Sequence, residues 1–286
     1  MIDLHIHTKV SDGSMTIDEI LEIAKANGIT HIAVTDHDTT QGLLYAVKAG
    51  EKAGVTVIPG IEISAYDYKR NKRAHILGYF IEPGCPSLES ICSDLTQRRC
   101  TASKLMTGKI IDAGYDITWK EIERYGGDSG VYKQHIMHAL MDKGYCESIY
   151  SKLYKDLFKR GTSSKTQGTA FIPLKYADAK EAIKAIRDSG GVAVLAHPGQ
   201  LCNFDAVEEW VKCGLKGIEA YHHSHSREET QKALEYAEKY KLVVTGGSDF
   251  HGFYGETPIQ PGIPDIKESD IIKLFNCSVK GELYGA

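Results

Sequence analysis

The sequence predicts an α/β barrel, built mostly from parallel strands and interrupted by a helical insertion. Two observations support this fold class. A strand–loop–helix pattern repeats at short spacing in the first 60 residues, and it resumes after about residue 169. Residues 85–168 contain few β-like runs and are predicted to be helical instead. The length of 286 residues with 42% apolar composition suits one large domain. We therefore expect a barrel from residues 1–84 and 169–286, with an insertion at 85–168.

The first part of the barrel is predicted from apolar runs and helix-capping residues. Thr16 and Glu19 form a capping-box pattern that opens a helix, and Gly28 closes it. Gly54 closes the next helix in the same way. The expected helices are 16–27 and 41–53. The expected strands are 2–7, 31–36, 55–58 and the two arms of a hairpin, 63–68 and 73–81.

The rest of the chain is predicted by the same criteria. The insertion is expected to hold helices at 88–112, 119–125, 133–143 and 147–159. Beyond it, strands are expected at 191–196, 217–221 and 242–245. Helices are expected at 177–189, 205–212, 227–240 and 268–275, followed by a short extended tail.

Histidines and carboxylates recur where the expected strands end. Residues two apart on a strand share a face, so His5 and His7 can bind one ion together. In a βα-barrel, the loops after the strands form the active-site face. Imidazoles and carboxylates without thiolates suit Mn²⁺, Fe²⁺ or Zn²⁺, and Mg²⁺ less well. The candidate metal ligands are His5, His7, Asp12, His37, Glu62, His75, His197, Asp249 and His251.

Composition excludes several classes of protein. A net charge of −4 excludes a strongly basic nucleic-acid surface, although bound metal could still attract a phosphate. The seven cysteines contain no C-x-x-C pair, which favours reduced thiols and a cytoplasmic location. The first residues enter a strand directly, so no signal peptide is expected, and no apolar run is long enough to cross a membrane.

Several motifs resemble those of the polymerase and histidinol phosphatase (PHP) family. They are His5-x-His7, Ser11-Asp12-Gly13, Thr35-Asp36-His37-Asp38, Gly60-Ile-Glu62, Ala74-His75-Ile-Leu-Gly78, Ala196-His197-Pro198-Gly199 and Gly247-Ser-Asp249-Phe-His251. The resemblance implies a distorted (β/α)₇ barrel that binds three divalent metal ions, Mn²⁺ first, with Fe²⁺ or Zn²⁺ as alternatives. It assigns the first ion to His5, His7, Glu62 and Asp249, the second to Glu62, His75 and His197, and the third to Asp12, His37 and His251.

The resemblance also suggests a mechanism. A hydroxide that bridges the first two ions is the expected nucleophile on phosphorus, which makes Glu62 and Asp249 catalytic through the ions they hold. His225 is the candidate acid for the leaving oxygen, or a phosphate ligand. His222 and His223 are alternatives, and all three could instead belong to a solvated loop.

The insertion is expected to set substrate choice. Residues 131–135 resemble the place where bisphosphatases of the family carry Arg-x-His facing a second phosphate. Here Lys133 replaces the arginine and cannot make its bidentate fork, while His135 keeps the histidine. A solvated helix start is the alternative for both residues. Asp3 shares a strand face with His5 and could orient a ligand imidazole.

The leading function is therefore a metal-dependent phosphoesterase of the 3′,5′-nucleotide bisphosphate phosphatase type. The alternatives are a cyclic ribose phosphate phosphodiesterase, then histidinol phosphate phosphatase, then an amidohydrolase. A degenerate, structural PHP module is the non-enzymatic alternative. The expected partner is a small phosphorylated substrate, which could be a nucleotide bisphosphate, a cyclic sugar phosphate or a short RNA end. We expect no membrane and no stable nucleic-acid complex, and the sequence leaves the oligomeric state open.

Overall fold

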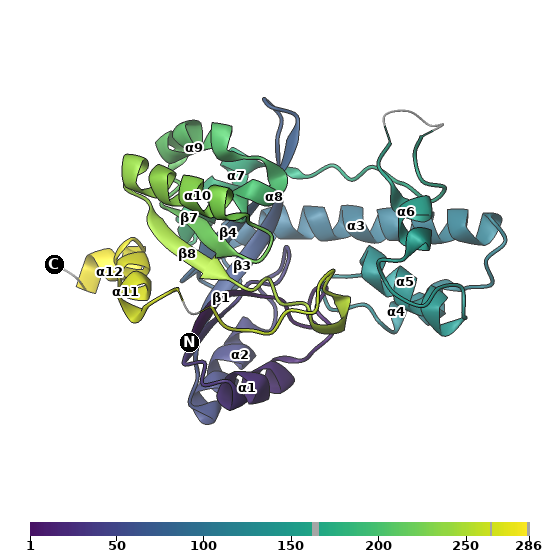
Figure 1. The fold of residues 1–286 in the computed structure, drawn as a ribbon, viewed down its shortest axis with the longest axis horizontal. Coiled ribbons are helices and arrows are strands. Elements are labelled where there is room, and N and C mark those ends of the chain that lie inside the picture. Colours follow the sequence, from purple (N-terminus) through teal and green to yellow (C-terminus); the bar gives the residue numbers. More distant parts are fainter. Residues whose placement is uncertain (162–165, 264, 285–286) are drawn as a thin grey trace.

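A computed structural model describes residues 1–161, 166–263 and 265–284. Its centre is an eight-stranded sheet with the strand order β1-β2-β3-β4-β6-β7-β8, and β5 pairs with β3 off this path (Figure 1). The strands are β1 (Ile2–Ile6), β2 (His31–Val34), β3 (Thr56–Asp67), β4 (Lys72–Tyr79), β5 (Ala177–Asp178), β6 (Val192–Leu195), β7 (Gly217–His222) and β8 (Val243–Gly247).

The sheet curls until its two edges meet. All neighbouring strands run parallel except β4, which is antiparallel to both β3 and β6. At the meeting point, the backbone N–H of Asp249 donates to the carbonyl of His5 (2.9 Å), and that of His7 donates to the carbonyl of Phe250 (3.0 Å). These contacts bring the ends of β1 and β8 together, and they confirm the barrel-like α/β fold expected from the sequence.

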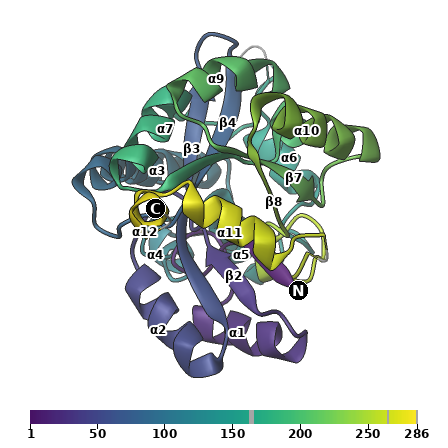
Figure 2. The same cartoon turned by 90° about the vertical axis from the view of Figure 1, so that its left-hand side faces the viewer.

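Helices cover both sides of the curled sheet. Figure 1 shows α7, α9 and α10 on one side and α1 and α2 on the other, and Figure 2 shows α11 and α12 across one end. The bounds are α1 (Ile17–Ala26), α2 (Leu43–Ala53), α3 (Pro86–Asp112), α4 (Trp119–Glu123), α5 (Lys133–Asp142), α6 (Lys152–Phe158), α7 (Ala179–Asp188), α8 (Pro198–Leu201), η1 (Phe204–Ala206), α9 (Val207–Cys213), α10 (Arg227–Tyr240), η2 (Gly252–Tyr254), α11 (Glu268–Asn276) and α12 (Val279–Tyr284).

Three expectations about these elements were wrong. The strand expected at 55–58 and the first hairpin arm are one strand, β3, because Pro59 pairs with β2 while Gly60 already pairs with β4. The helix expected at 147–159 begins only at Lys152. The tail expected to be extended forms α12.

Side chains alternate between the two faces of the strands. On β4, Ile76 belongs to the core that packs the outer helices, while Leu77 and Tyr79 belong to a second core that includes Leu274 of α11. Both faces of the sheet are therefore buried, as a barrel requires.

The insertion has a core of its own, and one long helix joins it to the barrel. The first half of α3 packs in the barrel core through Leu88, Cys92 and Leu95. Its second half, from Ala102 to Ile110, packs in a separate core formed mainly by α4, α5 and α6. Figure 1 shows α3 running from the sheet to these helices. A rise of about 1.5 Å per residue makes this 27-residue helix about 40 Å long.

The insertion also contacts the barrel beside the candidate ligands. The backbone N–H of Ser129 donates to the carbonyl of Val10 (3.0 Å). A Cβ on Gly127 would lie 2.3 Å from the carbonyl oxygen of Lys9, so only glycine allows this approach. The loop that carries Asp12 is therefore packed against the insertion. Within the described ranges, no helix combines the length and the apolar character needed to span a bilayer.

Candidate metal centre

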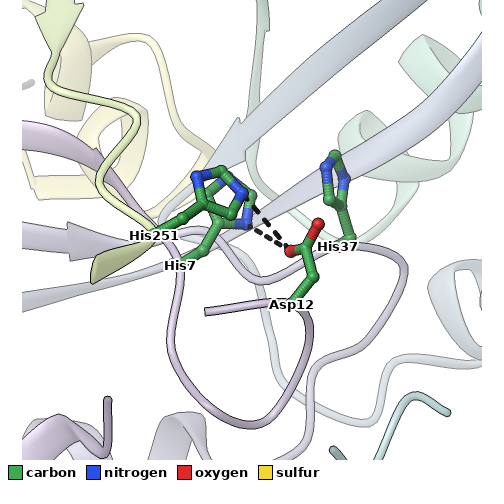
Figure 3. Close-up of side chains that lie close together, drawn as sticks. All are labelled: His7, Asp12, His37 and His251. Atoms are coloured by element: carbon green, nitrogen blue, oxygen red, sulfur yellow. Dashed lines mark ion pairs between the residues drawn. The ribbon is translucent and has the colours of Figure 1, made fainter. Parts of the chain in front are cut away.

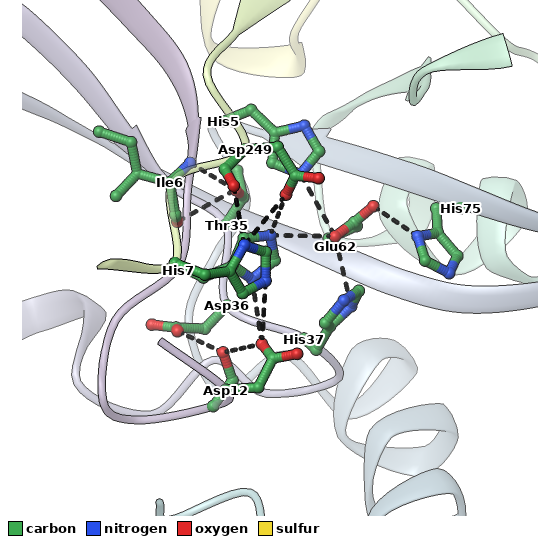
Figure 4. Close-up of polar contacts among 12 residues, drawn as sticks. His5, Ile6, His7, Asp12, Thr35, Asp36, His37, Glu62, His75 and Asp249 are labelled. Atoms are coloured by element: carbon green, nitrogen blue, oxygen red, sulfur yellow. Dashed lines mark hydrogen bonds and ion pairs between the residues drawn. The ribbon is translucent and has the colours of Figure 1, made fainter. Parts of the chain in front are cut away.

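Glu62 on β3 lies at the centre of a cluster of imidazoles (Figure 4). Its side chain is buried, and five histidine nitrogens surround its two oxygens. On Oε2 the partners are His5 Nε2 (3.2 Å), His7 Nε2 (3.1 Å) and His37 Nδ1 (3.3 Å). On Oε1 they are His75 Nδ1 (2.8 Å) and His197 Nε2 (3.1 Å). One carboxylate therefore links side chains from the ends of β1, β2 and β6 and from the middle of β4.

Asp249 completes a compact group with His5, His7 and Glu62. Asp249 Oδ1 lies 3.4 Å from His5 Nε2 and 3.2 Å from His7 Nε2. Ligand atoms bound about 2.1 Å from one ion lie about 3.0–3.4 Å apart, because the angles between them are about 90–109°. The spacing within this group therefore fits a shared cation.

A second compact group surrounds Asp12 (Figure 3). Asp12 Oδ1 lies 3.4 Å from His251 Nε2 and 3.6 Å from His7 Nδ1. His37 is the fourth member of the group. The three residues expected to hold the third ion thus lie together, and His7 approaches them with its second ring nitrogen.

The residues expected to hold the second ion lie around Glu62 Oε1. His75 and His197 both contact this oxygen. The group whose ligand atoms all lie within 4.8 Å of one another, however, joins Glu62 and His75 to His37 rather than to His197. His37 therefore lies between the positions expected for the second and third metal ions.

Unusual backbone geometry helps to aim two of these side chains. His197 has φ 22° and Asp249 has φ 54°. Residues other than glycine rarely adopt positive φ angles, and such conformations cost about 1–3 kcal/mol each. Packing at the ends of β6 and β8 must hold them, and strain of this kind is common at functional sites.

The cluster attracts positive charge. Burial raises the pKa of Glu62, but the nearby imidazoles of His37, His75 and His5 outweigh it and hold that pKa well below its usual range. Conversely, burial lowers the pKa of His7, but the neighbouring carboxylates of Asp249 and Glu62 outweigh it and raise that pKa to about 10. The cluster thus favours an ionised Glu62 with positive charge beside it.

A cation would satisfy several atoms that otherwise lack partners. Among the described residues, His5 Nε2, both nitrogens of His7 and His37 Nδ1 are buried without a hydrogen bond. Burial lowers the pKa of His37 to about 4, which leaves its imidazole neutral and able to bind a metal. Imidazole nitrogens and carboxylate oxygens are suitable donors for Mn²⁺, Fe²⁺ and Zn²⁺. The residues present therefore fit a divalent metal.

A family model for the PHP domain matches residues 3–259. The chain belongs to the PHP domain family. The phosphoribosyl 1,2-cyclic phosphate 1,2-diphosphodiesterase of Eggerthella lenta is 42% identical to it over 257 residues, covering 90% of this chain and 96% of the relative. The 3′,5′-nucleoside bisphosphate phosphatase of Chromobacterium violaceum is 28% identical over 259 residues, covering 87% of each.

A solved structure agrees with these relatives. A protein of Bifidobacterium adolescentis, assigned as a metal-dependent phosphoesterase, superposes with a TM-score of 0.86 at 26% identity, covering 100% of this chain and 98% of that one. This PHP protein is accordingly a metal-dependent phosphoesterase, the class of enzyme expected from its sequence.

The sequence missed one buried acid of this PHP site. Glu219 on β7 accepts a hydrogen bond from His5 Nδ1 (3.0 Å), the contact expected for Asp3. Asp3 instead accepts from the backbone N–H groups of His5, Ser248 and Gly262. The sequence feature that could have identified Glu219 is that it is the one carboxylate in the otherwise apolar run 217–221.

His225 does not occupy the position of a general acid. Its Nδ1–H donates to the carbonyl of Ala220 (3.0 Å), and its Nε2 accepts from the backbone N–H of Gly199 (3.1 Å). With both ring nitrogens engaged, His225 ties β7 to the loop after β6, which argues against the expected role as acid or phosphate ligand. His222 does lie in the site, with Nε2 3.4 Å from Asp249 Oδ2, and His223 Nδ1 donates to the carbonyl of Ser248.

A cavity of about 580 Å³ opens between the metal-ligand cluster and the insertion. It is lined at one end by Asp12, His37 and His75, and it also contains the side chain of Lys133. His135, by contrast, is fully buried elsewhere: its Nδ1 accepts from the N–H of Tyr132, and its ring packs against Tyr254. The side chain of His135 therefore caps α5 and does not line this cavity.

Basic side chains that the sequence did not single out line the same cavity. They are Arg73, Arg99 and Arg160. Arg99 on α3 is buried, forms an ion pair with Asp38 and stacks on the ring of Tyr132 at 4.4 Å. Its Nη1 has no hydrogen-bond partner among the described residues. The cavity therefore combines basic side chains with the metal-ligand cluster.

Replacing His225 with asparagine tests its structural assignment. Asparagine is too short to keep both backbone contacts, so stability should fall by about 1–2 kcal/mol. The shape of the pH–rate profile should not change. Thermal denaturation and steady-state kinetics provide the two readouts, and His31→Asn on the protein surface is the control, with an expected change within about 0.5 kcal/mol. If the His225→Asn variant kept its stability but lost one limb of the pH–rate profile, the result would support His225 as the general acid.

Proposed function

We propose that this PHP phosphoesterase binds three divalent ions, with Mn²⁺ preferred and Fe²⁺ or Zn²⁺ as alternatives. The ligands would be His5, His7, Glu62 and Asp249 for the first, Glu62, His75 and His197 for the second, and Asp12, His37 and His251 for the third. The compact groups described above support this assignment. When bound, the ions supply Lewis acidity that neutralises phosphate oxygens and activates water for attack on phosphorus.

The cavity beside the cluster supports a substrate that carries two phosphate groups. One phosphate would lie at Asp12, His37 and His75, and the other would reach the basic side chains of the insertion. Lys133 suits this role because, among the described residues, no carboxylate forms an ion pair with it. Its ammonium lies over the rings of Phe158 (5.4 Å) and Phe171 (6.0 Å), which shield it from water. A desolvated cation binds a phosphate more strongly than an exposed one.

Within this substrate class we favour a phosphoribosyl cyclic phosphate. The Eggerthella lenta relative, which by its name acts on phosphoribosyl 1,2-cyclic phosphate, is 42% identical and is matched over nearly its whole length. The bisphosphate phosphatase, whose substrate class the sequence alone places first, is 28% identical. A second reason is that Lys133 stands where the bisphosphatases carry an arginine. Lysine cannot make the bidentate contact with a phosphate that arginine makes. We also propose that residues 85–168 act as the substrate-selecting cap, because they supply Arg99, Lys133 and Arg160 to the cavity.

The single observation that carries this proposal is that one cavity is lined both by basic side chains and by members of the histidine–carboxylate cluster. The direct test is to load the protein with Mn²⁺, count bound metal by elemental analysis and follow hydrolysis by ³¹P NMR. The substrates are phosphoribosyl 1,2-cyclic phosphate, adenosine 3′,5′-bisphosphate, histidinol phosphate and a short 5′-phosphorylated RNA. We expect the cyclic phosphate to give the highest kcat/KM. Asp249→Asn is the control for contaminating phosphatases.

Other outcomes of that test have definite meanings. Turnover of adenosine bisphosphate alone would favour the bisphosphatase function, and turnover of histidinol phosphate alone would favour that phosphatase. No turnover of any substrate by metal-loaded protein would contradict the proposal.

The pH dependence of substrate binding tests the role of Lys133. Burial and the nearby charge of Arg73 lower the pKa of Lys133 to about 8, so its positive charge is present below pH 8 and is lost as the pH rises above it. We therefore expect kcat/KM to fall above pH 8 through a rise in KM. Lys133→Arg should move this fall to higher pH. Lys133→Met should remove it and lower kcat/KM by about 10–100-fold, since one hydrogen bond to a charged group contributes about 1.5–3 kcal/mol. An unchanged profile in both variants would exclude Lys133 from substrate binding.

A further inference from the structure

Glu219 lies between two of the proposed ligands without belonging to their ligand sets. It sits in the middle of β7, and its side chain is fully buried. Its Oε1 accepts a hydrogen bond from His5 Nδ1 (3.0 Å), and its Oε2 accepts one from the backbone N–H of His197 (2.8 Å). One carboxylate thus contacts residues at the ends of β1 and β6.

The contact with His5 selects a tautomer. A neutral imidazole that donates from Nδ1 keeps its lone pair on Nε2. This Nε2 faces Glu62 Oε2 (3.2 Å) and Asp249 Oδ1 (3.4 Å), where the first ion is proposed. Glu219 therefore directs the free lone pair of His5 toward the other ligands of that ion.

The contact with His197 fixes the backbone. With φ 22° and ψ 62°, His197 lies in a sparsely populated region, so neighbouring contacts must hold it there. Glu219 binds its N–H, and His225 binds the N–H of Gly199 two residues later. Both contacts originate from β7 or the loop after it. They hold the start of α8 so that the imidazole of His197 reaches Glu62 Oε1.

We propose that Glu219 is a positioning residue for the first two ions. It sets the tautomer of His5 and the backbone of His197, and it does not touch substrate. This inference rests on the ligand set proposed above. Glu219 bonds to ligands of the first two ions, whereas neither of these hydrogen bonds reaches Asp12, His37 or His251, to which the third ion is assigned. The third ion should therefore be independent of Glu219.

Replacing Glu219 with glutamine tests this role in the whole protein. Glutamine has nearly the same shape, but it offers one acceptor oxygen and no charge, so it cannot accept from both partners. Mn²⁺ binding is measured by equilibrium dialysis and elemental analysis over a range of free Mn²⁺. Two of the three ions should need about 10–100-fold more free Mn²⁺, and the third should be unaffected. Excess Mn²⁺ should restore kcat without changing the KM for substrate.

Asp67→Asn is the matched control. Asp67 is also a buried carboxylate that accepts two backbone hydrogen bonds, from Lys69 and Arg70, and it pairs with the guanidinium of Arg70, but it is the last residue of β3 and contacts none of the proposed ligands. Its variant should bind Mn²⁺ like the wild type. Equal Mn²⁺ affinity in Glu219→Gln and wild type would overturn the inference. Absence of Mn²⁺ binding by the wild type would instead contradict the proposed function.

A second measurement uses the wild-type protein and does not depend on the variant folding. NMR of ¹⁵N-labelled histidine in the Zn²⁺-loaded protein reports which nitrogen of His5 carries the proton. We expect a protonated Nδ1 that exchanges slowly with water, because its acceptor is fully buried. A proton on Nε2 would overturn the inference.

Discussion

The buried carboxylate of Glu62 is the constraint on which the site depends. A carboxylate removed from water costs several kcal/mol unless positive charge and hydrogen bonds replace its hydration. Here five imidazoles surround it, and they must converge from four strands to within 2.8–3.3 Å of its two oxygens. The closure of β8 against β1 and the positive φ angles of His197 and Asp249 both serve this convergence. A barrel whose strand ends meet on one face is therefore a condition of the chemistry.

The insertion contacts this cluster as well as lining the cavity beside it. Arg99 on α3 pairs with Asp38, the residue after His37. The hydroxyl of Tyr132 donates to the carbonyl of His37 (3.3 Å). Gln134 Nε2 donates to Asp12 Oδ2 (3.3 Å). Residues of the insertion thus contact two proposed ligands of the third ion, so we expect a change in the insertion to alter metal binding as well as the shape of the cavity.

The amino-acid sequence predicts the features that depend on local pattern. Carboxyl ends of parallel strands meet on one face, so the sequence alone is enough to group His5, Glu62 and Asp249. It gives Glu219 no role, because Glu219 lies within the expected strand 217–221 and not at its end. The sequence could not show that His135 is buried while Lys133 lines the cavity, because the spacing of the two residues says nothing about which side chain the fold buries. Helix α12 was missed because short terminal helices depend on packing rather than on their own propensity.

The most direct test of the central role of Glu62 is the metal content of Glu62→Gln. Glutamine keeps the shape but removes the charge and leaves a single oxygen that can bind a metal ion. Elemental analysis after equilibrium dialysis against Mn²⁺ should show the loss of the two ions proposed to share Glu62, with the ion of the Asp12 group retained. Circular dichroism should confirm that the variant is folded. If folded Glu62→Gln bound as much Mn²⁺ as the wild type, with the same affinity, the account of this site would be wrong.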